Sequence, residues 1–264
     1  MRRVRGTAGR ARWGWAVHAA AVVALVAGAQ GCATAKLTKE DQEKADYHYQ
    51  LAANHFSDKQ IPQAIRELTL SLEKNPQHAD ALHLMGFIAM GRQNYPQAVD
   101  FFKRAIEARP DFYICINNLG TALLASHRWD EAILVYEELI NKPTYNTPEL
   151  AYNNLGWAYH EAGQGDRAEE MLQMAIFLKP DLCLSYNNLG IVQLERKNTV
   201  GATRSLQQAI KRCPTYQEPH FHLGQLLREK QDLKAREYYQ RCYEIGPENT
   251  WGERCLSYLE LYSQ

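Results

Sequence analysis

The sequence lacks the features of several large classes of protein. It has no apolar run long enough to span a membrane, because its longest such stretch, residues 19–29, has 11 residues and a spanning helix needs about 20. It also has no excess of charge, since 30 Lys and Arg balance 30 Asp and Glu. Five of the basic residues and none of the acidic ones lie in residues 1–31, so the rest of the chain has a net charge of −5. A mildly acidic chain without a basic stripe is not expected to bind nucleic acid.

No motif for catalysis or cofactor binding stands out either. The sequence has no glycine-rich phosphate loop, no nucleophile elbow and no recognisable pair of catalytic carboxylates. His220 and His222 are two residues apart, which places them on different faces of a helix, and no acid or cysteine completes a metal-binding set. We therefore expect no enzymatic activity, no cofactor and no metal site.

The N-terminal residues 1–31 are typical of a signal peptide, with an arginine-rich start followed by the short apolar run. The Gly-Cys pair that follows resembles the lipobox of bacterial lipoproteins, in which the cysteine is lipid-modified, and it predicts lipid attachment at Cys32. Cleavage by an ordinary signal peptidase, after Ala29 or Ala35, is the alternative. Residues 32–44 are expected to form a polar tether. The residue after the cysteine is Ala33 and not aspartate. In this respect the sequence resembles the Gram-negative lipoproteins that are sorted to the outer membrane.

The tetrapeptide Asn-Asn-Leu-Gly occurs three times, at residues 117–120, 153–156 and 187–190. Copies 34 to 36 residues apart indicate the tetratricopeptide repeat, a helix-turn-helix unit of 34 residues. Small residues at fixed positions let the two helices approach, and a proline ends the second helix. We predict an all-α solenoid: a right-handed superhelix of six repeats closed by a C-terminal capping helix in residues 250–264. The repeats together cover residues 45–249 and are 45–78, 79–112, 113–148, 149–182, 183–216 and 217–249.

The second asparagine of each tetrapeptide is expected on the inner surface of the superhelix, one repeat apart, as Asn118, Asn154 and Asn188. An amide both donates and accepts hydrogen bonds, so it can pair with the backbone of an extended peptide. This arrangement resembles the asparagine ladder of certain superhelical tetratricopeptide proteins. The alternative is that these amides cap local turns or bind the neighbouring repeat.

Apolar residues flank the asparagines in the same register and predict a groove for a partner segment. Trp157 is the expected anchor, because aromatic residues dominate interface energetics. Lys and Arg are missing from the groove positions of these repeats, so a clamp for C-terminal carboxylates is not expected. The other predicted groove residues are Leu150, Leu184 and Ile191.

Cysteine pairing is open because export makes disulfides possible. Cys213 ends the second helix of the fifth repeat and Cys242 lies in the corresponding helix of the sixth, which predicts a Cys213–Cys242 bond. Pairing of Cys242 with Cys255 across a turn is the alternative, and buried free thiols are a third possibility.

The whole pattern resembles the lipoprotein pilotins of type IV pili. The stretches NNLGTALLASHRWDEA and YNNLGWAY carry most of the resemblance, together with the lipobox-like signal, the short tether, the six repeats and the insertion INKPTYNTPEL before the fourth. The resemblance implies a lipid-anchored protein on the periplasmic face of the outer membrane. Its partner would be a secretin protomer, which it would help to assemble into a multimeric pore, and it would be a monomer when free. A general periplasmic scaffold for cell-wall enzymes or another secretion system is the competing hypothesis.

Overall fold

The computed structural model describes residues 37–261, which form one compact unit. The predicted signal peptide, the predicted lipid-attachment residue Cys32 and the last three residues lie outside this range. Within it the chain forms thirteen α-helices and no strand, and none of these helices has the length and apolar character needed to cross a membrane. The helices are α1 (Lys39–Ser57), α2 (Ile61–Lys74), α3 (Ala79–Gly91), α4 (Tyr95–Ala108), α5 (Tyr113–Ala125), α6 (Trp129–Ile140), α7 (Pro148–Glu161), α8 (Gly165–Leu178), α9 (Cys183–Glu195), α10 (Thr199–Arg212), α11 (Gln217–Glu229), α12 (Lys234–Ile245) and α13 (Thr250–Glu260).

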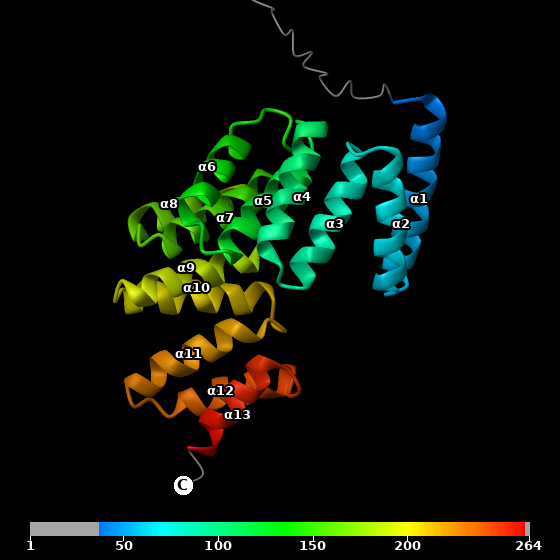
Figure 1. Cartoon of the computed structure of the whole chain (residues 1–264). Coiled ribbons are helices and arrows are strands. Elements are labelled where there is room, and N and C mark those ends of the chain that lie inside the picture. The colour runs from blue at the N-terminus through cyan, green and yellow to red at the C-terminus, as the bar shows by residue number, and fades with distance from the viewer. Residues whose placement is uncertain (1–36, 262–264) are drawn as a thin grey trace, which may run out of the picture. The chain divides into compact units, whose positions relative to one another are not determined.

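The helices form six consecutive antiparallel hairpins that stack in chain order, from α1–α2 to α11–α12 (Figure 1). Each odd-numbered helix contacts its hairpin partner and also the odd-numbered helix of the next repeat, and α13 covers α11 and α12 at the end. The all-α solenoid predicted from the repeats is therefore confirmed.

The first helix begins earlier than the sequence pattern indicated. It starts at Lys39, so the assignment of residues 39–44 to the tether is wrong. Thr38 caps it by accepting a 3.0 Å hydrogen bond from the backbone N–H of Asp41, and Glu40 and Asp41 lie in its first turn, where acidic side chains favour a helix N-terminus. The apolar repeat pattern begins only at Ala45, which is why these polar residues read as a tether.

A glycine of the first helix lets the second helix approach closely in five repeats. A Cβ on Gly156 would lie 2.7 Å from Cγ of Leu172, and one on Gly224 would lie 2.7 Å from Cε1 of Tyr239. Real Cβ atoms essentially never come this close, so a larger residue here would force the helices apart. The other three pairs are Gly86 with Phe102, Gly120 with Tyr136 and Gly190 with Leu206.

The turn inside every hairpin contains one residue in the left-handed region. The φ values lie between 55° and 73°, and only the fourth repeat has glycine there. The other five repeats have a residue with a side chain there, which is less favourable in free energy than glycine. The six residues are Lys59, Gln93, His127, Gly163, Lys197 and Gln231.

The insertion between α6 and α7 is held by an aromatic pair. Tyr145 is buried, with 8% of its surface exposed, and its ring centroid lies 5.8 Å from that of Tyr113. The Tyr113 hydroxyl shares a 2.5 Å hydrogen bond with the hydroxyl of Thr144. These contacts fold the extra residues onto the start of α5.

The disulfide pairing differs from our first expectation. Cys183 pairs with Cys213, and Cys242 pairs with Cys255, with Cα–Cα distances of 6.0 and 6.1 Å. The predicted Cys213–Cys242 bond is therefore wrong, and the alternative pairing of Cys242 is the one formed. The reason is the antiparallel hairpin: the first residue of α9 lies beside the end of α10, so Cys183 is a nearer partner for Cys213 than a residue one repeat away. Cys115 is a buried free thiol.

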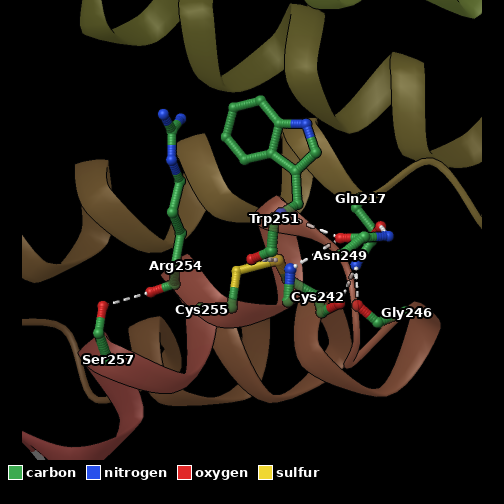
Figure 2. Close-up of a disulfide and its surroundings, with 9 residues drawn as sticks. Gln217, Cys242, Gly246, Asn249, Trp251, Arg254, Cys255 and Ser257 are labelled. Carbon is green, nitrogen blue, oxygen red and sulfur yellow. Dashed lines mark hydrogen bonds between the residues drawn. A yellow bond between two sulfur atoms is a disulfide. The ribbon is translucent and has the colours of Figure 1, made fainter.

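The C-terminal helix is fixed by the second disulfide and by a polar junction (Figure 2). Gln217 donates hydrogen bonds to the carbonyl oxygens of Cys242 and Gly246, at 2.8 and 3.1 Å. The side-chain oxygen Oε1 of Gln217 accepts a 2.6 Å hydrogen bond from Nδ2 of Asn249, which also caps α13. One glutamine thus connects α11, the end of α12 and the start of α13.

Candidate functional site: the central groove

A groove of about 510 Å³ crosses the middle of the solenoid, and we call it the central groove. Its lining comes from α5 and the turn after it, the first residue of α6, and helices α7, α9 and α11. The lining residues are Thr121, Leu124, Ala125, His127, Trp129, Asn153, Asn154, Trp157, Glu161, Leu184, Asn188 and Glu218.

The structure brings four of the seven predicted groove residues together here: Asn154, Asn188, Trp157 and Leu184. The other three, Asn118, Leu150 and Ile191, lie outside the lining. The amide of Asn118 instead donates a 2.9 Å hydrogen bond to Nε2 of His83 in the preceding repeat.

Sequence reasoning missed several lining residues, above all Trp129 and His127. Both lie at the turn between α5 and α6, whereas the repeat register points only to positions within the first helices. The two rings make an edge contact with centroids 4.7 Å apart. Trp157 has a similar neighbour in His160, also at 4.7 Å between centroids. Each tryptophan is thus supported by a histidine at its edge of the groove.

The asparagines form hydrogen bonds between repeats. Asn154 donates to Oδ1 of Asn117 at 3.1 Å and accepts a 3.1 Å bond from Asn153. Oδ1 of Asn153 in turn accepts from Ser185 at 3.0 Å and from Asn188 at 3.1 Å. These bonds join α5, α7 and α9, so the amides bind the neighbouring repeat, which was the alternative to a ladder dedicated to a peptide.

The network does not exhaust the capacity of the groove amides. An amide offers two N–H groups and two lone pairs. Asn154 uses one of each kind with neighbouring asparagines, and its amide also lies beside the hydroxyl of Tyr136. Asn188 is 8% exposed and donates one bond to Asn153. Asn154 is only half-buried, so its second lone pair can still accept from a partner backbone, and its position is fixed before the partner arrives.

Glu218 supplies a fixed negative charge at one end of the groove. Its Oε2 accepts a 2.8 Å hydrogen bond from the hydroxyl of Tyr216, and its Oε1 lies 3.7 Å from Nε2 of His222. Burial alone would raise the pKa of this carboxyl group, but the neighbouring His222 imidazole and the hydrogen bond from Tyr216 outweigh it and lower the pKa below its usual value. The carboxylate is therefore ionised at neutral pH. Burial also raises the pKa of Tyr216, which keeps its hydroxyl proton available to donate.

The described side chains show no arrangement of three or more His, Cys, Asp or Glu residues that could hold a metal ion. His220 is buried, with 5% of its surface exposed, whereas His222 lies beside Glu218. The groove offers aromatic faces, amides and carboxylates, which suits binding of a polypeptide segment.

Comparison with known proteins supports the repeat assignment. A model of the tetratricopeptide repeat matches residues 35–111 and 117–182, more than half of the chain. An N-acetylglucosaminyltransferase of Giardia intestinalis is 29% identical over 119 residues, and the O-mannosyl-transferase Tmtc3 of Drosophila melanogaster is 28% identical over 163. These matches cover 43% and 61% of this chain but only 8% and 17% of those proteins, so the chain spans less than a fifth of either.

Another relative matches over most of both sequences. The type IV pilus assembly protein PilF of Pseudomonas aeruginosa is 23% identical over 240 residues, which are 88% of this chain and 82% of PilF. The crystal structure of PilW, a type IV pilus biogenesis factor, shares the fold with a TM-score of 0.71 at 20% identity, over 80% of this chain and 98% of that one. The solved structure of Pseudomonas aeruginosa PilF gives 0.66 at 17% identity, over 83% and 99%. The chain belongs to the tetratricopeptide repeat family and is related along most of its length to the type IV pilus assembly protein PilF.

Proposed function

We propose that the protein is an outer-membrane lipoprotein that binds secretin subunits and promotes their assembly in type IV pilus biogenesis. The observation that carries this proposal is the match to PilF, which covers 88% of this chain and 82% of PilF. The match therefore covers the repeat array as a whole, whereas shared repeats alone would give the partial matches seen with the two transferases.

The central groove gives this proposal a binding surface. Trp157 and Leu184 offer apolar contact area, and the asparagines beside them are held by their hydrogen bonds to neighbouring repeats. A side chain that is ordered before binding loses less conformational freedom when a partner arrives. The protein would shield a secretin segment until the ring forms, by binding alone and without nucleotide or covalent chemistry.

A lipid at Cys32 would hold the solenoid at the periplasmic face of the outer membrane. Substitution of Cys32 by serine should then move the protein from the membrane fraction to the soluble periplasm and abolish labelling with a radioactive fatty acid. Membrane association that survives this substitution would refute the anchor.

The test of the proposed function is the amount of secretin multimer in outer membranes. It is measured by non-denaturing immunoblot in strains with and without the gene. The proposal expects multimers to disappear while the monomer persists. Trp157→Ala should reproduce much of this loss, whereas Phe177→Ala, which removes a 78% exposed aromatic side chain of α8 outside the groove, should not. Unchanged multimers in the deletion strain would favour a general periplasmic scaffold.

A further inference from the structure

The charges that line the central groove have one sign. Glu161 and Glu218 belong to the lining, and no lysine or arginine does. Arg128, next to the lining residue Trp129 in the chain, is bound to Glu131, with Nε 2.6 Å from Oε1. Glu161 is exposed at the end of α7 and forms no ion pair with any residue in the described part of the chain. The charge of Glu161 therefore faces solvent without a cationic partner, whereas the half-buried carboxylate of Glu218 lies beside Tyr216 and His222.

The two carboxylates lie at opposite ends of the groove. The odd-numbered helices run in the same direction, because each is separated from the next by one antiparallel helix. Glu161 is the last residue of α7, on the side of Trp129 and the α5–α6 turn. Glu218 is the second residue of α11, on the side of Leu184 near the start of α9.

The residues between the carboxylates are apolar, aromatic and amide. A path from Glu161 passes the two tryptophans, then the asparagine pair of α7, then Leu184, and ends at Glu218. Tryptophan is the best aromatic partner for a lysine or arginine, and a carboxylate beside it adds a charge pair. The amides between them suit an extended backbone.

We propose that the central groove takes an extended segment of a partner protein that has a lysine or arginine on each side of an apolar residue. The two cationic side chains pair with Glu161 and Glu218, and the apolar residue lies against Trp157 and Leu184. This inference rests on the proposed function of the protein as a binding protein for another chain, and it adds the chemistry of the segment.

A library of random twelve-residue peptides, selected on the purified full-length protein, tests the proposal without assuming a partner. We expect the selected pool to be enriched in lysine and arginine flanking an apolar residue. A fluorescein-labelled peptide from this pool should bind more weakly as salt is raised, because exposed charges are screened. Glu161→Gln should weaken it roughly two- to fivefold, the range of an exposed charge pair, and the Glu161→Gln/Glu218→Gln double variant should weaken it further.

Glu170→Gln is the matched control, because Glu170 is an exposed glutamate of α8 outside the groove. This variant should bind the peptide with the affinity of the wild type. Glu218 is half-buried, so the fold of its variants is checked by circular dichroism, while the exposed Glu161 gives a variant that tests the charge without disturbing the core.

A pool without excess lysine and arginine, or equal affinity in the double variant, would overturn the proposal. If binding of such a pool is lost in Trp157→Ala, the groove still binds protein segments and the proposed function stands. A library that yields no binder also overturns the proposed preference for lysine and arginine. The secretin immunoblot is a separate test and then shows whether the proposed function holds.

Discussion

Gly86 of α3 lies against the ring of Phe102 of α4 so closely that a Cβ on the glycine would stand 2.6 Å from Cε1 of the phenylalanine. Phe102 is fully buried within the hydrophobic core, so its ring has little room to move aside. Gly86→Ala should therefore destabilise the protein by about 1–3 kcal/mol, as overpacking of a dense core does.

The same helix supplies the control. Gly91, the last residue of α3, has open space around the position of a Cβ. Gly91→Ala should leave the free energy of unfolding unchanged or raise it by up to about 1 kcal/mol, since alanine favours the helix. Urea unfolding followed by circular dichroism measures both, and equal effects of the two substitutions would show that close helix approach is not the reason for the glycine.

The left-handed residue of each hairpin turn gives a second prediction. Gly163 has a φ of 73° and Lys197 has a φ of 60° at the corresponding position of the next repeat. Gly163→Ala should destabilise the protein by roughly 1 kcal/mol, and Lys197→Gly should stabilise it by up to that amount, because only glycine adopts this conformation freely. Thermal melts of the two variants should shift in opposite directions. A shift in the same direction would contradict the role of backbone conformation at this turn.

The disulfides give a third prediction. Replacing Cys183 and Cys213 together by alanine opens a loop with a sequence separation of 30, and replacing Cys242 and Cys255 opens one of 13. Chain-entropy estimates give losses of roughly 3–4 and about 3 kcal/mol, respectively. Mass spectrometry of a non-reducing proteolytic digest checks the pairing itself, and a peptide that joins Cys213 to Cys242 would contradict it.

Two histidines, the half-buried His83 and the buried His220, should make stability depend on pH. Burial lowers the pKa of His83 and of His220 below the ordinary 6.5. As the pH falls below about 6.5, the unfolded chain takes up protons at these residues before the folded chain does, so the stability that they contribute at neutral pH is lost. Urea unfolding at pH 7.5 and 5.5 should show this loss, and the His83→Gln/His220→Gln variant should show less of it. An identical pH dependence in both proteins would refute the assignment.

The periodic elements of the fold could be predicted because their cause repeats. Gly156 against Leu172 and Gly224 against Tyr239 are the same contact in different repeats, so one pattern in the sequence identifies them all. The start of α1 could not be predicted in this way, because Thr38 begins the helix with a local capping bond to Asp41, ahead of the first apolar position of the repeat pattern at Ala45.

The groove was only partly predictable for a similar reason. The repeat register places Trp157 and Asn154 on one surface. It does not show which hydrogen bonds Asn154 makes with Asn117 and Asn153, and so which of its groups stay free for a partner. Trp129 reaches the groove from the start of a second helix, and register assigns that position to the hairpin turn. Disulfide pairing depends on the distances between helix ends, as the Cys183–Cys213 bond shows.

The amide bonds between α5, α7 and α9 have a consequence for how the array unfolds. In a repeat protein, each unit is stabilised mainly by its two neighbours, so the strength of the junctions determines how many units open together. Junctions reinforced by Asn153 and Asn154 make the third, fourth and fifth repeats one cooperative block. Opening should then begin at the N-terminal hairpins, far from the disulfides, and a chain frayed at that end would still present an intact binding surface.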